Sequence, residues 1–210
     1  MRIDRLVLGE FETNCYVVRT DGSAADCLVV DTGLDVTGLL DFLRRNKLNP
    51  VALILTHGHI DHIAGVNALH SRFPDIKIYI HKLDADLLSD AVGNLSFMTG
   101  CSFTAAQPVS CVEEGDIIDL AGIKLQVIHT PGHTQGGICL YAKEDGVVFV
   151  GDTLFAGSVG RTDFPTGNTR QLIQGIKDKL LILPADTKVY PGHGPVTTIG
   201  QEKAHNPFFG

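Results

Sequence analysis

The feature that most restricts the fold of this chain is a cluster of metal-ligand side chains directly after an apolar segment. Residues 51–56 read VALILT and predict a strand buried on both faces. The next six residues, 57–62, read HGHIDH. Imidazole and carboxylate groups are the ligands that suit zinc, iron or manganese. The fold must therefore carry the end of a core strand to a place where a metal ion can bind.

The spacing within this hexapeptide predicts that its side chains point in two different directions. His57 and His59 are two residues apart, so on an extended segment they face the same side. Asp61 and His62 begin the next turn and can point to a neighbouring position. A polar loop without metal is the alternative interpretation. Such a concentration of ligands is rare by chance, however, in a chain with only 9 histidines among 210 residues.

Three motifs further along the chain add ligand-type side chains. His133 stands in the turn TPGHT, Asp152 follows a buried apolar strand in VGDTLF, and His193 stands in the turn YPGHG. Each taken singly is more often structural. A buried ionised aspartate is costly, however, unless it is paired or metal-bound. Together with the hexapeptide, the three motifs predict one metal centre at which distant segments converge.

The order of strand and helix patterns predicts an α/β fold. Short apolar runs alternate with segments whose apolar residues recur at helical spacing. We expect strands at 2–9, 14–20, 26–31, 51–56, 75–81, 116–120, 123–130, 137–143, 146–152 and 187–194. We expect helices at 37–48, 63–73, 82–92 and 168–183, and a loop or lid at 93–110. The arrangement we favour is a four-layer αββα sandwich, with two sheets face to face and helices outside.

Length and composition narrow the class of protein. The chain suits a single domain spanning residues 1–210. Its net charge of −7 disfavours nucleic acids and anionic membrane surfaces as partners. No apolar run approaches the roughly 18 residues of a membrane span, and no secretory signal is visible. The five cysteines include no CxxC pair, which indicates reduced thiols and a cytoplasmic protein.

The complete set of motifs resembles that of the metallo-β-lactamase superfamily. The pattern is HxHxDH, then a TPGHT histidine, a GDxLF aspartate and a PGHG histidine, and it covers nearly the whole chain. The resemblance implies the αββα sandwich and two divalent metal ions, zinc ahead of iron or manganese. It assigns one ion to His57, His59 and His133, the second ion to Asp61, His62 and His193, and the bridging position to Asp152. Asp31, in VVDTG, matches a family acid near the floor of the site and is expected to support a ligand.

This resemblance implies a hydrolytic chemistry. Two ions about 3.5–4 Å apart can share a water and lower its pKa toward about 7, which gives a hydroxide able to attack a carbonyl. Asp61 and Asp152 would be the catalytic carboxylates, and the ions would stabilise the oxyanion. A thiolate leaves without being protonated, because the pKa of a thiol is about 8.5. We therefore expect a small-molecule thioester as the substrate.

Within the superfamily, the chain is most similar to the short glyoxalase II-like proteins, which resemble hydroxyacylglutathione hydrolases. The similarity rests on Asp61 with His62, on LFAGSVGRTDFPTGN at 154–168 and on QEKAHNPFFG at 201–210. No cysteine stands at a ligand position, unlike in one β-lactamase subclass. We expect the chain to lack the C-terminal helical region with which full-length glyoxalase II grips glutathione.

Arg161 is the expected substrate-binding residue. It matches the lysine of a Lys-x-Tyr glutathione contact, whereas Asp163 stands where the tyrosine would be. A guanidinium can bind a substrate carboxylate in a bidentate manner. The alternative is a structural salt bridge between Arg161 and Asp163.

Two other functions stay open at the level of sequence. The segment GRTDF at 160–164 also resembles the persulfide dioxygenases of the same superfamily, which use one iron held by two histidines and one aspartate. His57, His133 and Asp152 would form that set here. The second alternative is a metal-binding module without catalysis, although seven ligand-type residues exceed what structural zinc needs. The oligomeric state is not encoded in any recognisable pattern.

The remaining histidines are expected to have structural roles. His81 is expected at the surface or as a helix cap, and His129 is expected to orient the loop of His133. His70 lies late in a predicted helix, and His205 is expected to pack in the C-terminal segment. Phe103, Phe155 and Phe164 could line a pocket, but we expect them to pack in the core. We expect no catalytic role for Cys101 or Cys111.

Overall fold

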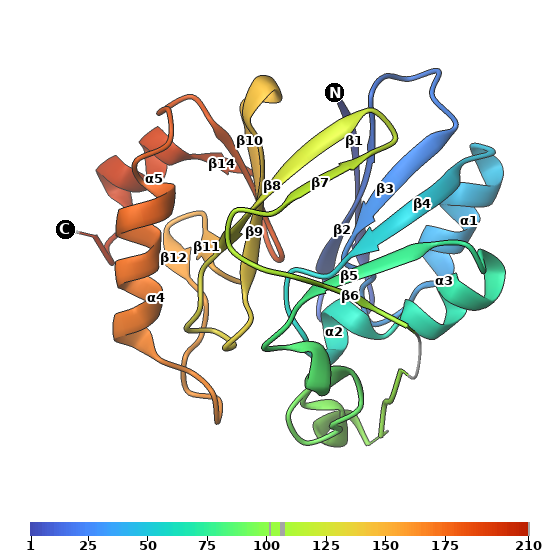
Figure 1. The fold of residues 1–210 in the computed structure, drawn as a ribbon. Coiled ribbons are helices and arrows are strands. Elements are labelled where there is room, and N and C mark those ends of the chain that lie inside the picture. The colour runs from blue at the N-terminus through green and yellow to red at the C-terminus, as the bar shows by residue number, and fades with distance from the viewer. Residues whose placement is uncertain (101, 106–107, 210) are drawn as a thin grey trace.

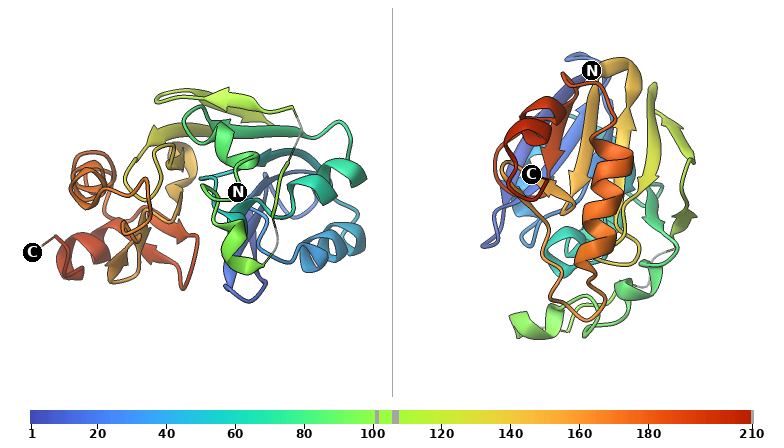
Figure 2. Two further views of the ribbon diagram at one scale, coloured as in Figure 1. Left: turned by 90° about the horizontal axis from the view of Figure 1, so that it is seen from below. Right: turned by 90° about the vertical axis from the view of Figure 1, so that its left-hand side faces the viewer.

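Two six-stranded β-sheets face each other in this protein, and helices cover their outer faces (Figures 1 and 2). The structure is a computed structural model that describes residues 1–100, 102–105 and 108–209. The four-layer αββα sandwich predicted from the sequence is therefore confirmed. Cys101, for which no catalytic role was expected, lies outside the described residues.

The N-terminal sheet keeps its strands in chain order. It consists of β1 (Arg2–Leu8), β2 (Thr13–Arg19), β3 (Asp26–Val30), β4 (Asn49–Ile54), β5 (Lys77–His81) and β6 (Ser110–Val112). The first three strands are antiparallel, and β3 to β6 pair in parallel. Parallel neighbours need crossover connections, and α1 (Thr37–Arg45) and α3 (Val66–Arg72) provide two of them on the outer face (Figure 1).

The second sheet has the order β14-β13-β10-β9-β8-β7. Its strands are β7 (Ile117–Leu120), β8 (Ile123–His129), β9 (Ile138–Ala142), β10 (Val147–Gly151), β13 (Lys188–Pro191) and β14 (Thr197–Thr198). The helix α4 (Thr169–Gly175) connects β10 to its parallel neighbour β13 and continues as a π-helical turn over Ile176–Leu180. It lies on the outer face with α5 (Ile199–His205) (Figure 1).

The apolar core has three layers, which explains why a strand such as β4 is apolar on both faces. Leu53 of β4 packs in the cluster under α1 and α3, whereas Ala52 and Ile54 pack in the cluster between the two sheets. Both faces of β4 are thus buried, as its continuous apolar sequence predicts. Tyr16 and Phe149 meet between the sheets with their ring centroids 5.3 Å apart. This packing fixes the two sheets against each other and so fixes the strand ends that carry polar residues.

The structure corrects several expected elements. The segment 82–92, expected to be a helix, contains only a 3-10 turn, η1 (Ala85–Leu88). Asp84, directly before this turn, instead accepts hydrogen bonds from the backbone of Gly58 and Gly136. The expected loop at 93–110 contains the 3-10 turn η2 (Ser96–Thr99) and the first residue of β6. Two short strands, β11 (Leu154–Phe155) and β12 (Ser158–Val159), form a separate hairpin that was not predicted.

The expectation that His81 lies at the surface is wrong. It is only 2% exposed, and its ring stacks on that of His129 with the centroids 4.0 Å apart. These residues end β5 and β8, one in each sheet, so the stack joins the two sheets.

The helices of the described residues are all too short or too polar to span a membrane.

Candidate metal centre

The hexapeptide at 57–62 adopts the two conformations that its spacing predicts. His59 has extended backbone angles (φ −75°, ψ 149°) and directly precedes α2 (Ile60–Ile63). Asp61 and His62 lie on this single helical turn. Both His57 and His62 are almost fully buried, at 2% and 0% exposure. The change from strand to helix therefore turns two pairs of ligands toward adjacent positions.

Three loops after other strands complete the cluster. His133 follows β8, Asp152 follows β10 immediately, and His193 follows β13. The two sheets are joined at this end: the Asn14 N–H donates to Gly192 O at 2.7 Å, and the Tyr16 hydroxyl donates to Pro191 O at 2.6 Å. All seven predicted ligand residues consequently lie together at one edge of the sandwich.

The ligand atoms form three overlapping groups in which all atoms lie within 4.8 Å of one another. The groups are His57–His59–His133, His57–His62–Asp152 and Asp61–His62–His193. His59 Nδ1 lies 2.9 Å from His133 Nε2, and His193 Nε2 lies 3.1 Å from Asp61 Oδ2. Two nitrogen ligands of a tetrahedral zinc ion lie about 3.3 Å apart, given Zn–N bonds of about 2.0–2.1 Å. The separations thus suit ligands that converge on a common ion.

Asp152 lies between the two outer groups. Its Oδ1 is 3.4 Å from His62 Nε2, and its Oδ2 is 3.6 Å from His133 Nε2 and 3.5 Å from His193 Nε2. Gly192 permits this approach, because a Cβ atom at that position would collide with Asp152 Oδ1. One carboxylate therefore contacts histidines of both groups, which is the placement that a bridging ligand needs.

Unpartnered polar atoms in this cluster support metal binding. Within the described chain, five buried side-chain polar atoms have no hydrogen-bond partner, and three of them are His57 Nε2, His62 Nε2 and Asp152 Oδ1. A buried polar atom without a partner costs about 1–3 kcal/mol. Three such atoms facing one another are explained if cations bind between them. The donor set of imidazoles and carboxylates fits zinc, iron or manganese.

The opposite nitrogens of four imidazoles are held by oxygen atoms. His62 Nδ1 lies 2.9 Å from Asp31 Oδ2, and His57 Nδ1 lies 3.2 Å from Thr56 Oγ1. Thr56 Oγ1 donates its own proton to Asp31 Oδ2 at 2.7 Å, so it can accept from His57. Asp31 thus occupies the supporting position expected for it, one contact away from the ligands.

The two remaining imidazoles are held by backbone carbonyls. His133 Nδ1 donates to Arg161 O at 2.7 Å, and His193 Nδ1 donates to Phe11 O at 2.9 Å. Because Nδ1 carries the proton, Nε2 keeps a free lone pair that points into the cluster. In His133 and His193 these contacts therefore favour the tautomer that can bind a metal through Nε2.

Electrostatic interactions within the cluster shift the pKa values of its histidines and aspartates. Burial and the neighbouring imidazoles hold the pKa of His57 well below its ordinary value and lower that of His59 to about 3. Burial opposes charge on His62 too, but nearby carboxylates, Asp61 first, raise its pKa well above the ordinary value. Despite burial, His62 holds the pKa values of Asp61 and Asp152 below their ordinary range. His57 and His59 are neutral and the aspartates ionised, which are the ligand forms.

Asp84 is a residue of the site that sequence reasoning missed. Its side chain is fully buried, and its Oδ2 accepts hydrogen bonds from Gly58 N at 2.9 Å and Thr134 Oγ1 at 2.7 Å. Its Oδ1 accepts from Gly136 N at 2.6 Å. Gly136 must be glycine here, because an added Cβ would lie 2.6–2.7 Å from Asp84 atoms. The sequence signal was weak, because an aspartate before an apolar run is typical of a helix N-cap.

A cavity of about 480 Å³ opens over the cluster. Its floor includes His59, Asp61, His133, Asp152 and His193. Phe155 and Phe164 line it, which corrects the prediction that these rings serve core packing. Phe103 does pack against the core under the N-terminal sheet, as predicted.

Arg161 also lines this cavity, and its side chain is ion-paired. Its Nε and Nη2 donate to the two carboxylate oxygens of Asp163 at 3.0 and 2.8 Å. Its guanidinium carbon lies 4.6 Å from the centroid of the Phe164 ring. Both partners of the pair are about two-thirds exposed, at 68% and 66%, so the pair contributes little to stability. Arg161 therefore forms the salt bridge and also lines the cavity.

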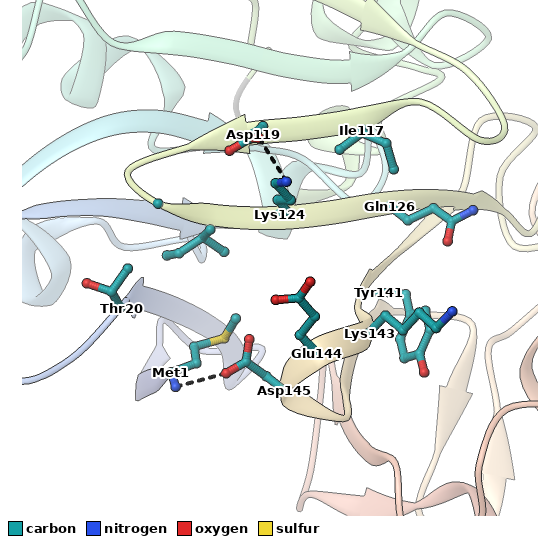
Figure 3. Close-up of a pocket in the computed structure, with 12 residues that line it drawn as sticks. Met1, Thr20, Ile117, Asp119, Lys124, Gln126, Tyr141, Lys143, Glu144 and Asp145 are labelled. Carbon is teal, nitrogen blue, oxygen red and sulfur yellow. Dashed lines mark hydrogen bonds and ion pairs between the residues drawn. The ribbon is translucent and has the colours of Figure 1, made fainter.

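A second groove, drawn in Figure 3, lies away from the ligand cluster. It is lined by the N-terminal Met1, by β7 and β8 and by the turn after β9. Two ion pairs lie along it: the N-terminal amine pairs with Asp145 at 2.9 Å, and Lys124 pairs with Asp119 at 3.6 Å. This groove brings together none of the ligand residues.

The fold and the site define an αββα protein with a buried centre of histidines and carboxylates that can hold metal ions. The family model described as the metallo-beta-lactamase superfamily matches residues 8–193. The chain therefore belongs to the metallo-β-lactamase superfamily.

Curated relatives support a hydrolytic member of this superfamily. The chain is 35% identical to the "Probable metallo-hydrolase YqgX" of Bacillus subtilis over 209 residues, covering 99% of this chain and 97% of the relative. It is 36% identical to the "Hydroxyacylglutathione hydrolase GloC" of Haemophilus influenzae over 210 residues, covering 99% and 98%. The similarity to glyoxalase II-type proteins thus rests on identities near one-third.

Two solved structures are similar over almost their whole length. One is the BLEG-1 B3 metallo-beta-lactamase, with a TM-score of 0.93 and 38% identity, covering 99% of both chains. The other is TTHA1623 in a di-iron-bound form, with a TM-score of 0.86 and 37% identity, covering 98% and 99%.

Proposed function

We propose that this protein is a metal-dependent hydrolase that cleaves small-molecule thioesters, of which hydroxyacylglutathiones are one class. The observation that carries the proposal is the set of seven ligand residues converging under one cavity. The relative named hydroxyacylglutathione hydrolase supports the thioester as substrate. The metallo-hydrolase class itself agrees with the family and with the names of its relatives.

We propose a two-ion centre. His57, His59 and His133 would hold one ion, Asp61, His62 and His193 the other, and Asp152 would contact both. Two divalent ions there would supply a water activated at neutral pH and electrophilic stabilisation of the attacked carbonyl. Zinc is the ion we expect first. The di-iron form of the similar protein TTHA1623 supports testing iron alongside zinc.

The residues of the chain would position the reactants. Thr13 Oγ1 donates to Asp61 Oδ2 at 3.1 Å and limits the rotation of this carboxylate. The low pKa of Asp61 keeps it ionised, so it can accept a hydrogen bond from a nucleophilic water. Asp152, 13% exposed, faces the same side of the cavity. The two carboxylates would therefore orient water toward a bound carbonyl.

The choice of a thioester rests on its leaving group. An ordinary thiol has a pKa of about 8.5, so a thiolate can depart near neutral pH without a general acid. An amide nitrogen needs a proton. A site composed of ligands and apolar rings therefore suits thioesters best.

Metal content and hydrolysis of S-lactoylglutathione, measured on the same preparation, test the proposal. We expect close to two metal ions per chain and thioester cleavage that follows metal occupancy. Oxygen uptake with glutathione persulfide is the parallel assay for the dioxygenase alternative. One iron per chain with oxygen uptake and no hydrolysis would overturn the proposal.

β-Lactam hydrolysis is a second candidate. It is favoured by the similarity to the structure titled B3 metallo-beta-lactamase. A chromogenic cephalosporin assayed beside the thioester compares the two activities directly. A kcat/KM higher for the cephalosporin than for every thioester would make β-lactam hydrolysis the preferred function.

We also propose a cytoplasmic location. Cys15, Cys27 and Cys139 are buried and free, and burial raises the pKa of Cys27 to about 12 and that of Cys139 to about 11. Protonated buried thiols suit a reducing compartment. Immunodetection in fractionated cells tests this proposal, and recovery of the protein outside the cytoplasm would contradict it.

A further inference from the structure

Five apolar side chains that line the cavity come from outside the ligand hexapeptide, and we call them the apolar collar. They come from four separate segments of the chain: the turn after β1, the segment around η2, the hairpin strand β11 and the segment after β12. Its members are Phe11, Leu95, Met98, Phe155 and Phe164. Convergence of distant apolar residues on one opening indicates a binding surface.

The collar begins directly beside the ligands. The Phe164 ring lies edge-on to His59 with the centroids 5.2 Å apart, and Phe155 lies 6.2 Å from the His193 ring. Phe11 contributes the carbonyl that accepts from His193 Nδ1. A substrate whose reacting carbonyl lies at the floor must therefore place its adjoining groups against the collar.

Two members of the collar are strongly exposed. The exposed fraction is 51% for Phe11 and 67% for Met98. Adjacent Phe97, outside the lining of the cavity, is 54% exposed. Apolar side chains gathered at one opening in this way mark a site at which a ligand covers them.

The segment that carries Leu95 and Met98 is held to the metal centre. Asn94 is fully buried, and its carbonyl accepts from Ile60 N, the first residue of α2, at 2.8 Å. The Asn94 side chain donates to Leu87 O at 2.8 Å and accepts from Ser96 N at 2.9 Å. This part of the collar is thus preorganised relative to the helix that bears Asp61 and His62.

The collar offers little that would bind anionic groups. Of the described residues that line the cavity, Arg161 is the one lysine or arginine, and Asp163 pairs with it. Glutathione carries two carboxylates, and coenzyme A carries phosphates. Carriers of this kind would find at most one partner for their anionic groups here.

We propose that this site selects thioesters by an apolar arm and uses at most one substrate carboxylate, so that the second carboxylate of a carrier such as glutathione adds little to binding. This inference rests on the proposed thioester hydrolysis and names its substrate class. The apolar arm would contact Phe11, Met98 and Phe164, and the single carboxylate would approach Arg161.

Thioesters of neutral thiols test the selection, with N-acetylcysteamine as the thiol of the acyl series. Acetyl, butanoyl and hexanoyl thioesters vary the acyl arm, and S-ethyl and S-hexyl thioacetates vary the thiol arm. We expect kcat/KM to rise by about two- to fourfold per methylene along one of the two series, as burial of a methylene implies. Replacing N-acetylcysteamine by glutathione should raise kcat/KM of the hexanoyl ester by less than about threefold, since at most one exposed ion pair is gained.

Matched variants assign the effect to the collar. Met98→Gln and Phe11→Gln replace exposed apolar side chains, and each should lower the ratio of kcat/KM for hexanoyl over acetyl ester by about threefold or more, because apolar contact is lost. Ile182→Gln is the control, because Ile182 is an apolar residue at least as exposed, at 72%, and does not line the cavity. The ratio should be unchanged in the control.

A binding measurement separates this inference from the proposed reaction. S-hexyl-N-acetylcysteamine is a thioether that cannot be hydrolysed, and calorimetry should show that it binds the metal-loaded protein more tightly than the S-methyl compound does. Tight thioether binding with no turnover of any thioester would support the collar and overturn the proposed hydrolysis. Turnover that is flat along both series, or that favours glutathione by tenfold or more, would overturn the collar and leave the hydrolysis standing.

Discussion

Asp84 Oδ2 accepts a hydrogen bond from Thr134 Oγ1 at 2.7 Å across 50 residues of sequence. The same oxygen accepts from Gly58 N, between His57 and His59, and Thr134 directly follows His133. One carboxylate thus joins the two loops that supply the three histidines of the first predicted ion. Hydrogen bonds that orient ligands are important to metal affinity, although the residues that make them touch no metal.

The first prediction concerns this contact. Asp84→Ala should weaken metal binding by about 10–100-fold, because the loops of His57, His59 and His133 lose their common acceptor. Asp84→Asn keeps the shape and part of the bonding and should fall between wild type and Asp84→Ala. The measurement is competition with a chromophoric chelator, with circular dichroism to check the fold. Equal affinity in a folded Asp84→Ala protein would contradict the orienting role.

The second prediction concerns metal removal. Chelation leaves the imidazole and carboxylate atoms of the centre without partners, whereas an ion at roughly a hundredfold above its Kd stabilises the folded state by about 2.7 kcal/mol. We expect the melting temperature to fall by about 5–10 °C and turnover to cease. Calorimetry and assays before and after chelation measure this, and separate addition of zinc, iron and manganese identifies the active ion. Full turnover in a preparation shown to be metal-free would refute the proposed metal-dependent reaction.

The third prediction separates the two interpretations of Arg161. If its guanidinium binds a substrate carboxylate, Arg161→Ala should raise KM for a monoanionic thioester by up to about tenfold, because a charged contact is lost. Asp163→Ala frees the guanidinium from its partner and should lower the same KM. Steady-state kinetics of both variants on one substrate decide the question. A KM unchanged in both would make the pair structural.

The fourth prediction uses the stack of His81 on His129. Burial, with the charge of His129, lowers the pKa of His81 to about 4, whereas an unfolded chain has a pKa of about 6.5. The unfolded state therefore binds more protons between these values. The stability contributed by neutral His81 is complete above about pH 6.5 and is lost as the pH falls toward 4.

His81→Gln removes this titration. The melting temperature of the wild type should therefore fall more between pH 6.5 and 4.5 than that of the variant. Thermal melts of both proteins across this range provide the comparison, and the wild type and variant share every other acid-sensitive group. Parallel loss of stability in the two proteins would show that His81 does not titrate as described.

Several features of the fold could be predicted because their cause is local. Continuous apolar character in VALILT indicates a strand buried on both faces, and the structure confirms it. The helix expected at 82–92 failed because Asp84 is used for tertiary contacts and its carboxylate faces two other loops. Local helix propensity gives no information about such tertiary hydrogen bonds.

The sequence by itself predicted which residues gather at the candidate metal centre and their local directions, because the spacing in HGHIDH and the turns around His133 and His193 are encoded by neighbouring residues. The tertiary structure alone decided which nitrogens of the imidazoles face the centre, that Asp84 joins two of its loops, and that apolar side chains from distant segments line the cavity. The physical reason is sequence distance. Phe11 and His193 are 182 residues apart, and only the packing of two sheets against each other brings such groups into hydrogen-bond contact.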